Sequence, residues 1–291
     1  MLIAKLEHFG IRGQLLQWIS DFLTDRKFRV RVGDTLSETH NVYSGVPQGS
    51  VLGPILFGIF ITDLKSVVKS YLSIFADDTK IMGNPLISHN IIQQDLDRIG
   101  QWTQDWLMSL NAAKCTVLHI GSNNPKMCYK IGSVSLKPVN SQKDLGVTIT
   151  HNLKWDVHIT NITKRTNSML YVVRKAFNII TKDLFIKIYK TYIRPLLEYA
   201  FQIWNPYFKK DIEMLEKVQR RATKMVASLR HKTYEERLSE LKLSTLEQRR
   251  QRGDLIETYK ILSEHYNVKN IENMFIMNPN PKLRVEMGCT R

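Results

Sequence analysis

The chain has 291 residues, 43% of them hydrophobic, which is enough for about two domains with buried cores. Its three scattered cysteines, Cys115, Cys128 and Cys289, argue against a zinc site or a disulfide framework, and neither a signal peptide nor an apolar run of ~20 residues points to a membrane. Residues 1–150 hold 15 Lys and Arg against 12 Asp and Glu, whereas residues 151–291 hold 27 against 15, so the second half carries most of the net charge of +15. This excess of positive charge favours a nucleic acid as the partner, and a basic surface without a partner is the alternative.

Hydrophobic periodicity predicts many short elements in the first half of the chain. Apolar residues at helical spacing indicate helices, and alternation of apolar and polar residues indicates strands. In chain order, the predicted elements are helices over 2–10 and 15–23, a hairpin of strands 28–32 and 39–43 around Gly33-Asp34, a helix over 50–68, two strands within 71–82, a helix over 91–106, and strands over 116–120, 127–131, 134–136 and 145–149.

Long amphipathic helices replace the strands in the second half. Between Ile159 and Phe177, for example, apolar residues recur with a period near 3.6. We therefore predict an α+β fold, with a sheet-containing domain over 1–150, a boundary near His151 and an all-α remainder. Beyond Tyr266 the chain is polar and rich in Asn and Pro, which predicts a poorly ordered end.

Two adjacent carboxylates, Asp77 and Asp78, lie between the two apolar strands predicted within 71–82. Their charges repel each other and the apolar flanks reduce their solvation, so a divalent cation would relieve both effects. Mg²⁺ prefers carboxylate oxygens together with water and substrate phosphates. An exposed Asp-Asp turn without a ligand is the alternative.

A second unusual segment, Gly45 to Phe57, comes before the carboxylates and reads GVPQGSVLGPILF. Pro47 fixes its own φ angle, Gln48 offers a donor and an acceptor, and Gly49 lets a ligand approach the backbone. Such a rigid turn suits contact with a base pair or a nucleotide. A simple strand-to-helix turn capped by Ser50 would explain the glycines but not the Pro-Gln pair.

The run GVPQGSVLGPILF followed by FADD resembles the palm of reverse transcriptases from non-LTR (LINE-type) retrotransposons of the jockey/CR1 type. The resemblance implies a partial polymerase palm with an antiparallel sheet, RNA-directed DNA polymerase activity, an RNA template, a DNA primer and deoxynucleotide substrates. It also implies that Asp77 and Asp78 bind two Mg²⁺ ions. Pro47, Gln48 and Gly49 would then contact the template or the nucleotide, and we expect the aspartates to face an open cleft that contains Gln48.

Two further segments of the first half carry the same resemblance. Trp106-Leu107, Leu110-Asn111 and Lys114-Cys115 resemble the next palm motif, which makes Lys114 a candidate acid for the leaving pyrophosphate. An exposed lysine at the start of a strand is an equal alternative. Asp144 to Val147 resembles the primer-grip hairpin, where Leu145 and Gly146 would meet the primer backbone, and a simple β-bulge is the alternative there.

The helical half also resembles these elements, in the segments 192–199, 203–206 and 215–222. The resemblance implies a helical thumb over 151–230, followed by a helical extension over 231–291. On the predicted helix from Met214 to Leu229, an apolar side faces inward and a basic side could follow the phosphates of a duplex. That basic side consists of Lys217, Arg220, Arg221 and Lys224. A solvated basic face is the alternative.

The palm of this family needs a third aspartate, in a motif of the form D-x-x-x-A-F-D that comes before a helix and a Gly-Ile pair. Here that pair is Gly10-Ile11, so the motif is expected upstream of Met1. Asp63 is interpreted as a solvated residue rather than a substitute. We therefore expect these 291 residues to be inactive alone. A non-catalytic nucleic-acid-binding module and a translated remnant without a cellular role are the competing hypotheses.

Overall fold

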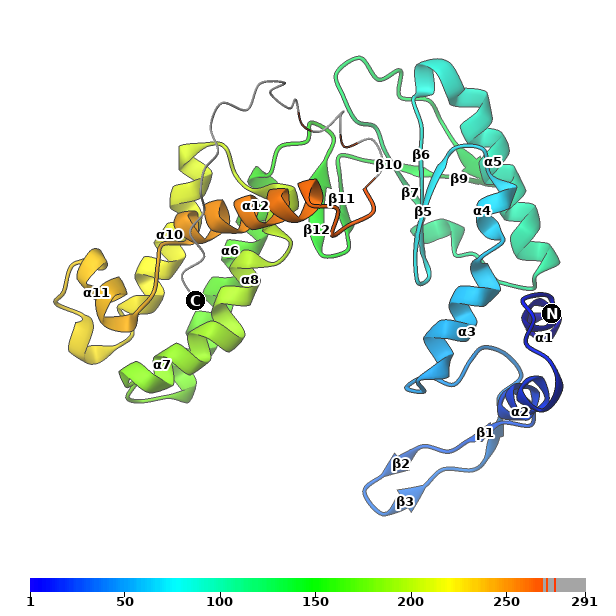
Figure 1. Cartoon of the computed structure of the whole chain (residues 1–291), viewed down its shortest axis with the longest axis horizontal. Helices are drawn as coiled ribbons and strands as arrows, with labels where there is room; N and C mark the ends of the chain where they lie inside the picture. Colours follow the sequence, from blue (N-terminus) through cyan, green and yellow to red (C-terminus); the bar gives the residue numbers. More distant parts are fainter. Residues whose placement is uncertain (269–270, 272–274, 276–291) are drawn as a thin grey trace. The chain divides into compact units, whose positions relative to one another are not determined.

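A computed structural model describes residues 1–268, 271 and 275 of the chain, which divides into two compact units, Met1–Asn140 and Ser141–Arg291 (Figure 1). Helices and small sheets occur together, which confirms the α+β class. Cys289 and most of the predicted poorly ordered end lie outside the described residues. Within the described part, none of the helices is both long and apolar enough to cross a bilayer.

The first part of unit 1 follows the predicted order of elements. The helices α1 and α2 come before a hairpin whose inner strands turn at Gly33-Asp34, as predicted. The predicted helix over 50–68 is divided in two. The elements are α1 (Leu2–His8), α2 (Gly13–Leu23), β1 (Lys27–Phe28), β2 (Arg31–Val32), β3 (Thr35–Leu36), β4 (His40–Asn41), α3 (Leu52–Ile61) and α4 (Leu64–Val67).

The second part of unit 1 holds the predicted hairpin within 71–82, the long helix and four short strands. Of these strands, β10 was not predicted. The elements are β5 (Tyr71–Phe75), β6 (Asp78–Met82), α5 (Pro85–Asp105), the 3-10 turn η1 (Ala112–Lys114), β7 (Thr116–Leu118), β8 (Lys130–Ile131), β9 (Val134–Ser135) and β10 (Lys137–Val139).

The sheet differs from the single antiparallel palm sheet that we expected. Over the described residues the strands form six two-stranded pairs, of which β7–β10 is parallel and the other five are antiparallel. A parallel pair needs a long connection that returns the chain to its starting edge. The segment between Leu118 and Lys137, which contains the β8–β9 hairpin, supplies that connection.

Apolar side chains of α3, α4 and α5 hold the β5–β6 hairpin in place. Ile61, Leu64, Ile99 and Trp102 are buried, and Leu72, Ile74 and Ile81 of the hairpin pack against them. A second cluster joins α1, α2 and α3 through Leu6, Ile19 and Leu56. Since the hairpin alternates its side chains between two faces, one face is covered by helices and the other faces away from them.

Unit 2 begins with a hairpin and continues with helices. Its boundary at Asn140/Ser141 comes before the predicted His151, because this hairpin packs on the helical part: Thr148 N donates to His158 Nδ1 over 3.1 Å. The elements are β11 (Ser141–Asp144), β12 (Val147–Thr150), α6 (Asp156–Ala176), α7 (Lys182–Ile188), the π-turn η2 (Tyr189–Ile193), α8 (Arg194–Glu198), α9 (Phe201–Trp204), α10 (Lys209–Thr223), the 3-10 turn η3 (Ala227–Leu229), α11 (Tyr234–Leu241) and α12 (Leu246–Leu262).

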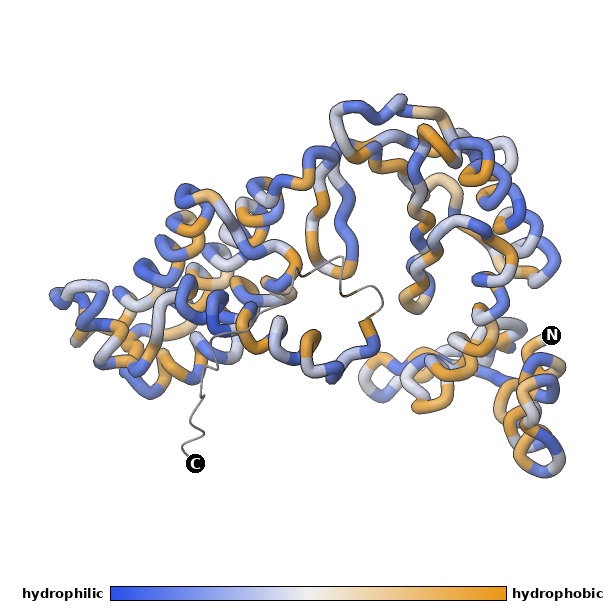
Figure 2. The backbone as a smooth tube through the Cα atoms, turned by 45° about the horizontal axis from the view of Figure 1, so that its top comes forward, coloured by the Kyte–Doolittle hydropathy of each residue, from blue (hydrophilic) through white to orange (hydrophobic). Residues whose placement is uncertain are grey.

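The core of unit 2 is one large apolar cluster that draws on α6, α7, α8, α10 and α12. In Figure 2, hydrophobic and hydrophilic segments alternate along these helices, as expected when one side of each helix is buried. Pro195 lacks an N–H and its ring would meet the carbonyl one turn earlier, which accounts for the wide η2 turn just before it. Trp204, fully buried, donates from Nε1 to Tyr199 O over 2.8 Å.

Candidate active site

The two aspartates lie at the turn of the β5–β6 hairpin, as predicted. Phe75 pairs with Asp78, so Ala76 and Asp77 form a two-residue turn. Ala76 has a φ of +52°, whereas Asp77 has a negative φ. This is the pattern of a type II′ turn, in which glycine is favoured at the first position, and alanine there costs about 1–2 kcal/mol. Strain of this kind is often retained at functional turns.

The strand register places Asp78 on the face of the hairpin that the helices do not cover. Leu72 and Ile81 pair with each other and point into the core, so the alternating positions Ser73, Lys80 and Asp78 point the other way. Asp77 and Asp78 are both exposed. The two carboxylates are thus exposed to solvent at the end of a hairpin whose other face packs against α3, α4 and α5. That they share a cleft with Gln48 stays a prediction.

Asp95 of α5, which the sequence analysis did not select, anchors the entry to this hairpin. Its side chain is fully buried and accepts hydrogen bonds from Ser70 N at 2.7 Å, from Lys69 N at 3.1 Å and from Arg98 Nη1 at 2.7 Å. Lys69 and Ser70 immediately precede β5, so Asp95 positions the strand that leads to the turn at Ala76 and Asp77. A lone acidic residue among the apolar positions of a predicted helix is the signal that could have identified it.

The segment around Gln48 forms a compact turn at the start of α3. Ser50 Oγ donates to Pro47 O over 2.7 Å and accepts from Gly53 N over 3.0 Å, so Ser50 closes the turn before α3, whose N-cap position is Val51. A Cβ at Gly53 would lie only 2.8 Å from Pro47 O, so the turn requires glycine there. Gly49 has a φ of +82° and open space beside it, and Gln48 is exposed. The turn therefore leaves Gln48 and Gly49 accessible to a ligand.

Lys114 ends the 3-10 turn η1 and is exposed. Its backbone N–H donates to Asn111 O over 3.0 Å, which holds the turn just before β7. This position agrees with the predicted lysine at the start of a strand and leaves its role as an acid a prediction. Asp63, interpreted as solvated, has a partly exposed side chain that also pairs with Lys5 at 2.7 Å, and the Lys5 ammonium lies 3.6 Å from the centre of the Trp106 ring.

The predicted primer-grip residues form the turn between β11 and β12. Asp144 pairs with Val147, and Leu145 and Gly146 have φ of +43° and +89°, the pattern of a type I′ turn rather than the β-bulge considered as the alternative. Tyr199, which the sequence analysis named only as part of a motif, supports this turn. Its hydroxyl donates to Leu145 O over 2.9 Å, and its ring lies 3.0 Å from where a Cβ of Gly146 would be.

The four basic residues predicted for nucleic-acid contact are all exposed on α10 or at its end. The inward side is as predicted for Leu215, Val218 and Ala222, whereas Met214 is half-exposed. Two of the four have protein partners. Arg221 Nη1 donates to Asn167 Oδ1 over 2.6 Å, and the Arg220 guanidinium lies 4.9 Å from the centre of the Tyr234 ring. Lys217 and Lys224 complete the set.

Carboxylate oxygens are the ligands that Mg²⁺ prefers, so Asp77 and Asp78 suit such an ion in their chemistry and exposure. Across residues 1–268, 271 and 275, no group of three or more His, Cys, Asp or Glu side chains is placed to hold a metal. The two aspartates would therefore bind an ion together with groups of a substrate or with further ligands.

The sequence of the chain is similar to those of known proteins. The profile of the family described as "Reverse transcriptase (RNA-dependent DNA polymerase)" matches residues 1–155, more than half of the chain. The chain is 27% identical over 243 residues to the probable RNA-directed DNA polymerase from transposon X-element of Drosophila melanogaster. The aligned region covers 76% of this chain and 27% of that relative. The chain is 28% identical to the RNA-directed DNA polymerases from the mobile element jockey of Drosophila melanogaster, over 233 residues, and of Drosophila funebris, over 231.

Each jockey match covers 74% of this chain and 25% of the relative. The chain thus spans about a quarter of the length of these curated relatives.

Proposed function

The chain belongs to the reverse transcriptase (RNA-dependent DNA polymerase) family, and on this premise we propose that it supplies part of the palm and the thumb of an RNA-directed DNA polymerase from a LINE-type element. The observation that carries the proposal is the exposed pair Asp77 and Asp78 on a strained hairpin turn, held from behind by a helical core. The substrates we propose are an RNA template, a DNA primer and deoxynucleotides.

In this proposal, Asp77 and Asp78 hold Mg²⁺ at the turn. When bound, the ions would activate the primer hydroxyl and stabilise the departing pyrophosphate. Gln48 and Gly49 contact the template base or the incoming nucleotide, because the Pro47 turn leaves both accessible. The Leu145-Gly146 turn positions the primer backbone, and Tyr199 keeps the shape of that turn.

The second candidate function is nucleic-acid binding without catalysis. The excess of Lys and Arg in residues 151–291 favours it, since charge alone gives affinity for phosphates. Primer extension distinguishes the two functions. We expect no detectable extension by the 291-residue chain with Mg²⁺ or Mn²⁺, because two adjacent carboxylates hold the ions from one side only.

A longer polypeptide, with a D-x-x-x-A-F-D segment before Met1, is expected to extend a primer on an RNA template. If it binds the hybrid but adds no nucleotide, the non-catalytic function is favoured. Template-dependent synthesis by the 291-residue chain that Asp77→Asn abolishes would contradict the need for a further carboxylate.

Lys114→Ala in the longer polypeptide is expected to slow nucleotide addition by about 100-fold while changing the apparent nucleotide affinity by less than about 3-fold. The reason is that a group that protonates the leaving pyrophosphate acts in the transition state and not in the ground state. Single-turnover kinetics over a range of nucleotide concentrations separate the two parameters. Lys126→Ala, at another exposed lysine of unit 1, is the control. A change confined to affinity would leave Lys114 as a phosphate contact.

A further inference from the structure

An open hollow lies in unit 2 beside the start of α11, where α10, the segment after it and α11 meet. Basic side chains dominate its lining: Arg220, Lys224, Arg230, Lys232 and Arg237. Tyr234 and Glu235 also line it, and Glu235 is the acidic member of the lining. Only Arg220 and Lys224 belong to the basic helix side that the sequence predicted.

Arg237 is the unusual member, because its charged side chain is buried with only 3% exposure. Its Nε donates to Thr223 Oγ1 over 3.0 Å and its Nη1 donates to Lys232 O over 2.6 Å, so both acceptors are neutral oxygens. None of the ion pairs found among the described residues includes Arg237. A buried cation without an anionic partner is costly, so an anion in the hollow would stabilise it.

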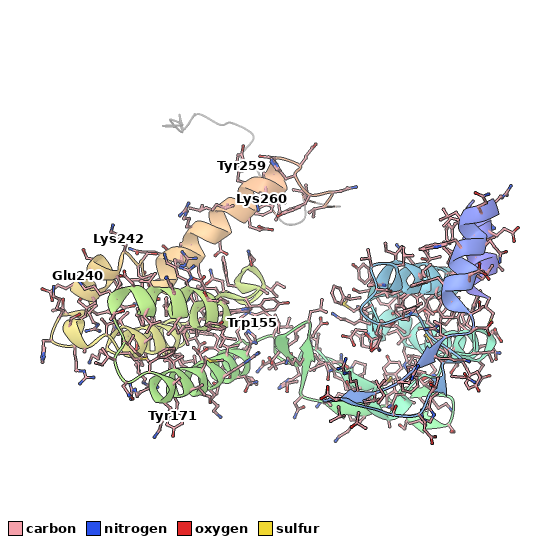
Figure 3. All side chains as sticks on the ribbon, turned by 90° about the horizontal axis from the view of Figure 1, so that it is seen from below. Trp155, Tyr171, Glu240, Lys242, Tyr259 and Lys260 are labelled. Atoms are coloured by element: carbon pink, nitrogen blue, oxygen red, sulfur yellow. The ribbon has the colours of Figure 1, made fainter. Side chains whose placement is uncertain are left out.

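The acidic residues of α11 neutralise the positive charge of the hollow only in part. Glu240, at the end of α11 in Figure 3, pairs with Lys182 and with Lys232, and these contacts lower the pKa of its carboxyl to about 2. Glu236 accepts from Thr233 N over 2.7 Å in the capping box of α11. Glu235 is thus one acidic residue in the lining against five cations, and among residues 1–268, 271 and 275 the ion pairs include Lys232 but none of the other four.

Tyr234 arranges two of these cations around one ring. The Arg220 guanidinium lies 4.9 Å and that of Arg237 5.6 Å from the ring centre. The tyrosine hydroxyl points away into the core, where it donates to Glu216. Two guanidinium groups next to one aromatic ring repel each other, and an anion bound by both would offset the repulsion.

We propose that this hollow binds a phosphate group of a nucleic-acid backbone. Arginine predominates in the lining, and its planar fork of N–H donors matches two phosphate oxygens at once. The lining is open to solvent, and apart from Tyr234 its residues are charged or polar, so it would bind the backbone and not read sequence. This inference rests on the proposed function, and it moves the contact from the outer side of α10 to the junction of α10 with α11.

The test compares two double variants of the 291-residue chain with the same loss of charge. R220Q/R230Q removes two exposed arginines of the hollow, and R165Q/R174Q removes two exposed arginines of α6. The probe is a fluorescein-labelled RNA–DNA hybrid of 20 base pairs, with binding followed by anisotropy over a series of KCl concentrations. Each phosphate contact contributes about −0.9 to the slope of log affinity against log salt.

We expect R220Q/R230Q to flatten the slope of log affinity against log salt by about 1–2 units and to weaken the binding of two hybrids of unrelated sequence equally. R165Q/R174Q is expected to change the slope and the affinity less. In a second measurement, inorganic phosphate at matched ionic strength is expected to raise the Tm of the wild-type chain but not that of R220Q/R230Q. Arg237→Gln should also remove this rise, but it removes buried hydrogen bonds and so destabilises the fold, and the exposed pair is therefore the main test.

If the wild-type chain binds the hybrid and the two double variants behave alike, the hollow is not the contact, while the polymerase proposal stands. If the wild-type chain does not bind the hybrid, the proposed thumb interface fails. A rise in Tm with phosphate that depends on Arg220 and Arg230 would then overturn the backbone as the source and assign the hollow to a free phosphate.

Discussion

Asp77→Asn in the longer polypeptide is expected to lower the rate of primer extension about 1000-fold. The amide keeps the size of the side chain but removes one of the two adjacent negative charges that the exposed turn presents. Loss of charge stabilisation at a metal-dependent reaction centre amounts to several kcal/mol, and ~4 kcal/mol corresponds to that factor. Single-nucleotide extension at saturating substrate measures it.

The control for this prediction is Asp97→Asn, which makes the same chemical change at an exposed position of α5. Asp97 accepts from Gln93 Nε2 on the helix surface, so its replacement is expected to leave the rate within about 2-fold. Circular dichroism of both variants checks that the fold is retained. If the folded Asp77→Asn variant keeps its rate within 10-fold of the parent, the turn is not the reaction centre.

Asp95→Asn is expected to destabilise unit 1 by about 3–5 kcal/mol. The fully buried carboxylate accepts from two backbone N–H groups and from Arg98, and an amide can neither accept all of these bonds nor pair with the guanidinium. Disruption of a buried charged network generally has a cost of this size. Amide hydrogen exchange of the peptide that contains Lys69, Ser70 and β5 measures the change where it arises. Asp97→Asn is again the control, with an expected change below ~0.5 kcal/mol.

The same residue predicts a pH dependence. Burial raises the pKa of the Asp95 carboxyl, but the hydrogen bonds from Ser70, Lys69 and Arg98 outweigh burial and hold that pKa below its ordinary value of 3.8. The stability from the charged form is therefore present above pH 3.8 and is lost as the pH falls through the lower folded value. The difference in stability between the parent and Asp95→Asn should narrow below about pH 4. A difference that stays constant down to pH 2 would contradict the assigned cause.

Several features of this protein could be predicted from the sequence because they depend on neighbouring residues. Alternating apolar residues on both sides of Ala76 and Asp77 are sufficient for a hairpin, and a two-residue turn then places Asp78 at its end. The hydrogen bonds of Ser50 join residues three positions away on either side. The helices of unit 2 were likewise predictable from a period of 3.6.

Only the tertiary structure decided which distant residues support these local elements. Asp95 and Ser70 are 25 residues apart in the chain, and Tyr199 and Leu145 are 54 apart. Residue type alone does not reveal such partners, because an aspartate on a helix is far more often solvated than buried. The parallel pairing of β7 with β10 could not be predicted either, because the sequence of a short strand does not indicate the direction of the strand beside it.

The charge of unit 2 was likewise predictable in part from the sequence, and the rest was decided by the tertiary structure. The excess of Lys and Arg after residue 150 was evident from composition, and it predicted an acidic partner. Helical spacing alone grouped Arg220 with Arg221, but the folded chain bonds Arg221 to Asn167 and places Arg220 beside Arg237, which comes from another helix. Periodicity assigns a residue to a side of its own helix, whereas the packing of α10 against α11 determines which charges meet and which, like Arg237, are buried against neutral oxygens.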